Sequence, residues 1–73
     1  MNYAVEQRMR FIEFIVDNFE FVRPAHVSEY FGLASAQATR DISMYSRLAP
    51  NNIFYLPSEK KWVKKNNFDL SYK

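Results

Sequence analysis

The chain contains one glycine, Gly32, and this residue lies between two segments that have the apolar spacing of α-helices. Because glycine adopts the left-handed backbone conformation at little cost, Gly32 is expected to end the helix that precedes it. Leu33 and Ala34 then leave only a tight turn before the next helical segment begins near Ser35. Two helices joined by so short a turn are typical of a helix-turn-helix motif.

Both helices of this pair have recognisable limits. The first of them is expected over about residues 24–31, because proline is favoured at the first helical position and Pro24 stands there. The second is expected over about residues 35–48, since Pro50 prevents its continuation. Its inward positions recur at i, i+4 and i+7, and they are Ala38, Ile42 and Tyr45.

A longer amphipathic helix is expected earlier in the chain, over about residues 6–20. Its apolar positions fall on one face of a helix, and they are Phe11, Ile12, Ile15 and Phe19. The side facing solvent is expected to carry the charged residues Arg10, Glu13 and Asp17.

The chain after Pro50 changes from helical to β-forming residues. Residues 53–56 and 61–64 are expected to form a hairpin, the wing, with residues 57–60 as its loop. Residues 65–73 form a tail with no clear element, expected to be either a dimer contact or disordered. The predicted fold class is therefore mainly α with a small β-hairpin: a winged helix-turn-helix, that is, a three-helix bundle plus wing, in a single domain over residues 1–73.

Composition excludes several classes of function. A chain of 73 residues without cysteine and with one histidine, His26, has no ligand set for a zinc site, and no cofactor is expected. Glu13 and Asp17 are helical neighbours on a solvated face without a pocket, so an enzyme is not expected. No apolar run has the roughly 20 residues of a membrane span, and the start lacks a signal-peptide pattern, so the expected location is cytoplasmic.

Charge is distributed unevenly along the chain. Residues 1–34 carry five acidic and three basic side chains, whereas residues 35–73 carry three acidic and seven basic ones. A basic half beside an acidic half is compatible with a polyanion-binding surface on one side of the molecule.

The outward face of the helix expected over residues 35–48, the third in chain order, has the residue types that read DNA. Glutamine can bond the N6/N7 edge of adenine, arginine can bond the O6/N7 edge of guanine, and hydroxyl groups can bond either bases or phosphates. Lysines at the hairpin tip are placed to reach the DNA backbone. The residues expected to contact double-stranded DNA are Arg23, Ser35, Gln37, Thr39, Arg40, Ser43, Arg47, Lys60 and Lys61.

Several segments resemble the N-terminal winged helix-turn-helix domain of WYL-domain bacterial transcriptional regulators, some of which repress phage-defence operons. Residues 31–42 are similar to the family signature F-G-V-S-x-x-Q-A-S-x-D-L, and residues 8–14 are similar to its R-x-x-F-I-E-F start of helix 1. Arg23 takes the place of the family's arginine before helix 2. Residues 49–55 and 58–62 resemble the two strands of the family's wing. The resemblance covers residues 8–63.

This resemblance implies a DNA-binding repressor or regulator, bacterial or phage-encoded. The family's response to an effector is not carried over to these residues, and no small-molecule ligand is inferred. It also implies that Asp41 pairs with a nearby base, Arg23 or Arg8. The chain departs from the family pattern at Ala34, where the family has the serine that caps helix 3; either Ser35 caps one residue later or that cap is lost. The family's C-terminal sensing and dimerising regions are absent from these residues, so the chain is either a freestanding binder or a fragment.

Alternatives remain open at this point. A lone winged helix has a small footprint on DNA, so useful specificity predicts a homodimer, formed through Phe14, Val16 and Phe21 or through the tail. A winged helix that docks on a protein instead of DNA is the second candidate function. Trp62, Tyr55 and Phe54 either stack on bases or pack the wing on the third helix. Lys64 and Lys65 either contact the DNA backbone or only protect a strand edge, and His26 is expected at the surface.

Overall fold

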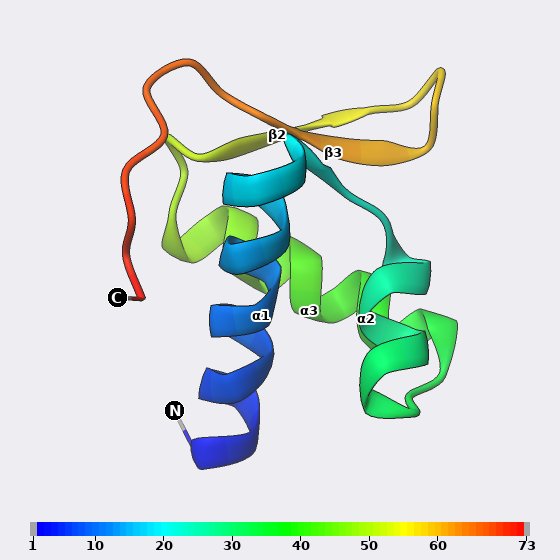
Figure 1. Ribbon diagram of the computed structural model, residues 1–73. Helices are drawn as coiled ribbons and strands as arrows, with labels where there is room; N and C mark the ends of the chain where they lie inside the picture. Colours follow the sequence, from blue (N-terminus) through cyan, green and yellow to red (C-terminus); the bar gives the residue numbers. More distant parts are fainter. Residues whose placement is uncertain (1, 73) are drawn as a thin grey trace.

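A computed structural model describes residues 2–72. Its elements follow in the order α1, β1, α2, α3, β2 and β3 (Figure 1). Their bounds are Tyr3–Phe19, Phe21–Val22, Pro24–Phe31, Ser35–Leu48, Ile53–Leu56 and Lys61–Lys64. The helices lie on one side of a small antiparallel sheet, toward which the C-terminal end of α1 points (Figure 1). This arrangement confirms the predicted fold class of a winged helix domain.

The first helix begins three residues before its predicted start because Asn2 caps it. The Asn2 side-chain oxygen accepts a hydrogen bond of 2.9 Å from the Val5 N–H, which satisfies one of the free donors of the first turn. The helix ends at Phe19, and the left-handed φ of 75° at its C-cap residue, Glu20, turns the chain toward the sheet.

The buried face of α1 differs from the predicted one. Met9, Ile12 and Val16 are fully buried, and Glu13 is buried beside them. Phe19, expected to face inward, is 58% exposed, and Glu13, expected to face solvent, is 1% exposed. The expectation was wrong because periodicity identifies an apolar stripe, whereas the partners that later segments bring to it decide which flank is covered.

A strand that the sequence pattern does not predict, β1, follows α1. It pairs with β3, with Phe21 opposite Val63 and Val22 opposite Trp62, so β3 is the central strand in the order β1-β3-β2. A strand of two residues is too short to show an alternating pattern. Its conformation depends on pairing with a strand from the other end of the chain.

The turn between α2 and α3 has the predicted geometry. Gly32 has a φ of 67°, and the N–H groups of Gly32 and Leu33 both donate to the carbonyl of Ser28. These bonds satisfy the Ser28 carbonyl, which the helix end would otherwise leave free. At the start of α3, Ala34 is the N-cap residue and offers no side-chain hydrogen bond, so the family's cap is lost rather than moved to Ser35.

The core lies where the helices meet the sheet. Its buried apolar residues are Met9, Ile12, Val16, Val22, Val27, Ala38, Ile42, Tyr45, Ala49, Ile53 and Trp62. Trp62 therefore packs inside, whereas Phe54 and Tyr55 of the wing remain about half exposed. None of the helices in residues 2–72 is both long and apolar enough to span a membrane.

The tail folds back against the helices instead of extending away (Figure 1). The buried Glu13 carboxylate accepts hydrogen bonds from the Ser71 N–H at 2.9 Å, from the Tyr72 N–H at 2.7 Å and from the Tyr45 hydroxyl at 2.7 Å. Backbone donors bonded to a carboxylate form strong, charge-assisted hydrogen bonds. Residues 66–72 are held against the helices, so the expectation of disorder is wrong, whereas the alternative expectation, a dimer contact, stays a prediction.

Asn52 holds the tail at a second point. Its side-chain nitrogen donates to the Tyr45 hydroxyl at 2.9 Å and to the Asp69 carbonyl at 2.8 Å, while its oxygen accepts from the Asp69 N–H at 3.0 Å. We call this set of hydrogen bonds the tail network. It comprises Glu13, Tyr45 and Asn52 with their bonds to one another and to the tail. Every buried side-chain polar atom among the described residues has a hydrogen-bond partner.

Candidate nucleic-acid interface

The third helix divides into a buried face and an open face. Ala38, Ile42 and Tyr45 are completely inaccessible, as the sequence pattern predicts. The opposite side carries the candidate DNA-contacting residues. Ser35, Thr39, Arg40 and Arg47 are exposed, and Gln37 and Ser43 are half-buried.

A buried carboxylate lies beneath this open face. Asp41 is 1% exposed, and one of its oxygens accepts a hydrogen bond of 2.7 Å from Nε of Arg8 on α1. Its other oxygen accepts a bond of 2.9 Å from Nε2 of Gln37. The expectation that Asp41 pairs with a base is correct, and the base is Arg8. Burial of this ion pair is compensated because both carboxylate oxygens are bonded.

The same chain of hydrogen bonds continues to the surface. Oε1 of Gln37 accepts a bond of 3.1 Å from Nη2 of Arg40, which is exposed. A continuous line of contacts, which we call the α3 relay, therefore runs from α1 to the open face of α3. It consists of Arg8, Asp41, Gln37 and Arg40.

A second basic group forms where β1 meets β3. The Arg23 guanidinium lies 5.0 Å and the Lys61 ammonium 4.5 Å from the centre of the Phe21 ring. Cations are attracted to the negative face of an aromatic ring, so Phe21 holds both side chains in one region. Lys61 also forms an ion pair with Glu59 at 2.8 Å, and this contact lowers the pKa of the Glu59 carboxyl. The sequence pattern does not indicate this group, because β1 is missing from it.

The hairpin tip, α2 and the N-terminal end of α3 lie on the same side of the molecule (Figure 1). Lys60 is exposed on the hairpin loop and has a left-handed φ of 52°. The structure thus brings cations from the wing and from the start of α2 to the side where α3 begins.

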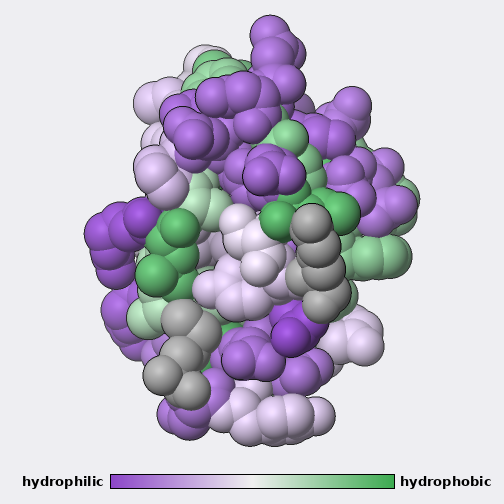
Figure 2. Space-filling view, turned by 90° about the vertical axis from the view of Figure 1, so that its left-hand side faces the viewer, coloured by the Kyte–Doolittle hydropathy of each residue, from purple (hydrophilic) through white to green (hydrophobic). Residues whose placement is uncertain are grey.

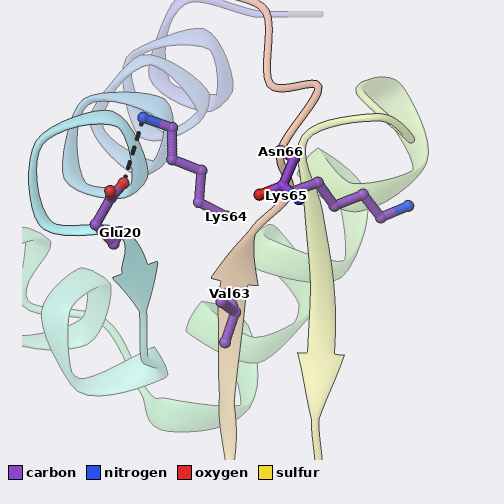
Figure 3. A pocket seen from close by; sticks show the side chains of 5 residues that line it. All are labelled: Glu20, Val63, Lys64, Lys65 and Asn66. Carbon is purple, nitrogen blue, oxygen red and sulfur yellow. Dashed lines mark ion pairs between the residues drawn. The ribbon is translucent and has the colours of Figure 1, made fainter.

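Lys64 and Lys65 are engaged within the protein. Figure 3 shows Lys64 turned toward Glu20 and Lys65 turned the other way, beside an open hollow of about 300 Å³ that Val63 and Asn66 also line. The Lys64 ammonium lies 3.3 Å from a Glu20 carboxylate oxygen and 3.4 Å from one of Asp17. Desolvation lowers the pKa of Lys64, but the bonds to Glu20 and Asp17 outweigh it and raise the pKa overall. The Lys65 ammonium donates to the Pro50 carbonyl at 2.8 Å.

His26 has a structural contact at the start of α2. Its ring Nδ1 accepts a hydrogen bond of 2.9 Å from the backbone N–H of Arg23, and its backbone N–H donates to the Arg23 carbonyl at 3.0 Å. His26 is half-buried, and it fixes the backbone of Arg23.

The expected dimer surface is partly wrong. Val16 is fully buried and Phe21 lies under two cations, whereas Phe14 is 58% exposed. Phe14 lines an apolar hollow of about 390 Å³ between α1 and α2, together with Phe11, Tyr30 and Phe31. On the face that Figure 2 shows, hydrophobic residues form separate patches between hydrophilic ones.

Comparison with known proteins agrees with this geometry. The family model of the BrxR transcriptional regulator winged helix-turn-helix domain matches residues 4–73. No curated protein matches the chain. The match covers nearly the whole sequence and confirms the resemblance to the winged helix domain of a transcriptional regulator. The chain therefore belongs to the family of BrxR transcriptional regulator winged helix-turn-helix domains.

Proposed function

We propose that this protein binds specific sequences of double-stranded DNA by placing α3 in the major groove, and that it represses transcription from the bound site. The observation that carries the proposal is the division of α3: Ala38, Ile42 and Tyr45 are buried, while Thr39 and Arg40 are open to solvent. A helix that is to read a groove needs such a division, because one side must hold it in its domain.

Contacts with DNA are assigned by chemistry. Arg40, Thr39 and Ser43 lie on the open face and are proposed to meet base edges. Phosphate contacts are assigned to the cations around the wing and to the ends of α3, because these groups can position the protein without reading sequence. The residues proposed for phosphate contact are Arg23, Ser35, Arg47, Lys60 and Lys61.

The proposed binding unit is a homodimer on a two-fold symmetric site. A single module buries only about 600–1,000 Å² on DNA, which gives limited discrimination. Two copies would place their α3 helices in half-sites about one helical turn, or a multiple of it, apart.

Selection of bound duplexes from a random pool, followed by titration of the selected and a random duplex, tests the proposal. Arg40→Ala should weaken binding to the selected duplex by about 1–3 kcal/mol, with a smaller loss on random duplex. Lys61→Ala should weaken binding to both alike and reduce the dependence on salt, because it removes a phosphate contact.

Lys65→Ala is the matched control for Lys61→Ala. It removes the same charge, but Lys65 follows the end of β3, whereas Lys61 begins this strand beside the hairpin loop, so the effect of Lys65→Ala on DNA binding should be small. Equal and negligible losses for Arg40→Ala and Lys61→Ala on both duplexes would contradict the assignment.

A second candidate function is docking on another protein. The exposed aromatic side chains around the hollow between α1 and α2 favour it, since Phe14 is 58% and Tyr30 70% exposed. Aromatic residues often dominate protein interfaces. This candidate predicts no salt-dependent binding of duplex DNA, and a larger effect of Tyr30→Ala than of Arg40→Ala on binding to the protein partner.

A further inference from the structure

Both ends of the Gln37 side-chain amide are engaged within the protein. Its nitrogen donates to Asp41 at 2.9 Å, and its oxygen accepts from Nη2 of Arg40 at 3.1 Å. An amide can bond the N6/N7 edge of adenine only if its oxygen and nitrogen are both turned toward the base. In this structure the amide is instead oriented by its two protein partners.

The inner end of the α3 relay is firmly anchored. Asp41 is 1% exposed, and the bond of 2.7 Å from Arg8 is a charge-assisted contact between α1 and α3. Because Asp41 is fixed by Arg8, its second oxygen is a fixed acceptor for Gln37. The orientation of Gln37 is thus set from inside the domain.

The outer end of the relay is the Arg40 guanidinium group, which has further N–H donors besides the one bonded to Gln37. Arginine has five N–H donors in a planar fork, and the contact with Gln37 uses one of them. Supporting one N–H fixes the plane of the fork and reduces the rotational freedom lost on binding. Guanine offers two acceptors, O6 and N7, to such a fork, whereas adenine offers one acceptor beside a donor.

We infer that Arg40 reads a guanine, and that Gln37 and Asp41 are positioning residues that hold its guanidinium rather than base-contacting residues. This inference rests on the proposed DNA-binding function and deepens it. It assigns to Gln37 a role different from the adenine contact expected from its residue type, and it predicts a guanine at one position of each half-site.

The test compares four forms of the full chain: wild type, Gln37→Met, Arg40→Ala and the double variant. Methionine has nearly the length of glutamine and a high helix propensity, but it can neither donate to Asp41 nor accept well from Arg40. Each form is used to select duplexes from a random pool, and is then titrated with the selected duplex and its guanine-to-adenine variants.

Arg40→Ala should lower the preference for guanine over adenine at one position by about 5- to 150-fold. Gln37→Met should lower the preference at that same position by about 2- to 10-fold, the effect of losing one typical intramolecular hydrogen bond. The double variant should lose no more than Arg40→Ala alone, because both changes act through one contact. Affinity for random duplex should be unchanged in Gln37→Met, since its charge is the same.

Gln7→Met is the matched control, because it makes the same change on α1, outside the relay and outside the residues assigned to DNA contact. It should leave the guanine preference at the Arg40 position unchanged. Gln37→Met leaves one oxygen of the buried Asp41 without its partner, so its melting temperature should fall by several degrees or more. Circular dichroism should still show the wild-type helix content at the temperature of the titrations, which separates loss of positioning from loss of fold.

Two results would overturn the inference while leaving the proposed function intact. In one, Gln37→Met keeps the full guanine preference. In the other, Gln37→Met loses a preference for adenine at a different position of the site, which would mean that Gln37 contacts a base directly. If the wild type enriches no sequence at all, the proposed function fails together with the inference.

Discussion

The hydroxyl group of Tyr45 connects two buried polar side chains at the centre of the molecule. It donates to Glu13 at 2.7 Å and accepts from Asn52 at 2.9 Å, and the residue is completely inaccessible. Burial, followed by the hydrogen bond to Glu13, raises the pKa of Tyr45 well above its ordinary value of about 10. A negative phenolate beside the Glu13 carboxylate would have no compensating charge.

This shift predicts a specific loss of stability at alkaline pH. Above about pH 10 the unfolded chain releases the Tyr45 proton while the folded protein keeps it, so the free energy of unfolding falls as pH rises, by about 1.4 kcal/mol per pH unit for this group. Below pH 10 both states are protonated and the contribution is constant. Urea unfolding between pH 8 and about pH 11 measures the slope.

Tyr45→Phe isolates this contribution from that of the lysines and other tyrosines. The variant should be less stable at neutral pH by about 1–3 kcal/mol, because Glu13 and Asn52 each lose a partner. Its stability should decline less steeply above pH 10. Identical slopes for variant and wild type would show that Tyr45 ionises in the folded state as easily as in the unfolded state.

At the scale of the elements, α3 carries the candidate interface but starts without a side-chain cap. Ala34 has the extended backbone of an N-cap residue, with a φ of −66° and a ψ of 149°, yet it has no acceptor for the free N–H groups of the first turn. The helix is therefore held by packing of its buried face rather than by its own end.

Ala34→Ser should stabilise the protein by about 1 kcal/mol, because serine can accept from an N–H of the first turn. Ala36→Ser is the matched control: it adds the same hydroxyl to the second residue of α3, whose helical backbone does not place it as an N-cap acceptor, so it should give no comparable stabilisation. Urea unfolding of both variants checks the difference. Equal effects at the two positions would mean that the first turn of α3 gains nothing from a side-chain acceptor.

The elements also show which parts of the fold were accessible from sequence. Periodicity and the breakers Pro24, Gly32 and Pro50 locate α2, the turn and α3, because these are local properties of the backbone. β1 and the burial of Glu13 depend on contacts with residues near the other end of the chain, and no local pattern encodes them. The cluster of Arg23 and Lys61 on Phe21 was missed for the same reason.

The candidate site shows the same division. Residue types on α3 indicate a DNA-reading face, and the outward positions of Thr39 and Arg40 follow from the period of the helix. The contact of Gln37 with Arg40 could have been anticipated from their spacing of three residues. The anchoring of Asp41 by Arg8 was expected from the resemblance to a family, since helical periodicity does not show which arginine on another element lies nearby.

At the scale of the whole molecule, the tail network joins α1, α3, the start of β2 and the last described residues. Glu13 lies on α1, Tyr45 on α3 and Asn52 just before β2, and together they hold the backbone of residues 69–72. Phe68 and Tyr72 pack against the core from the tail. The tail is thus an integral part of the domain.

Glu13→Gln tests this role. The neutral amide keeps one acceptor oxygen, so it can serve either the tail N–H groups or the Tyr45 hydroxyl, and the tail bonds that remain lose the strength that the carboxylate charge gives them. Stability should therefore fall by about 1–3 kcal/mol. Amide exchange at Ser71 and Tyr72, measured by NMR, should accelerate more than exchange in α2. Glu29→Gln, at an exposed position of α2, is the control and should change neither the stability nor the amide exchange of the tail. Unaltered exchange in the tail of Glu13→Gln would contradict the proposed anchoring.

The tail network also has a consequence for how such chains change over time. At its centre a carboxylate, a phenol and an amide are hydrogen-bonded to one another. Replacing one of them therefore leaves a buried polar group without a hydrogen-bond partner. Single replacements at Glu13, Tyr45 or Asn52 should therefore be rare among relatives. The positions are expected to covary, keeping this polar set together or exchanging it jointly for an apolar one.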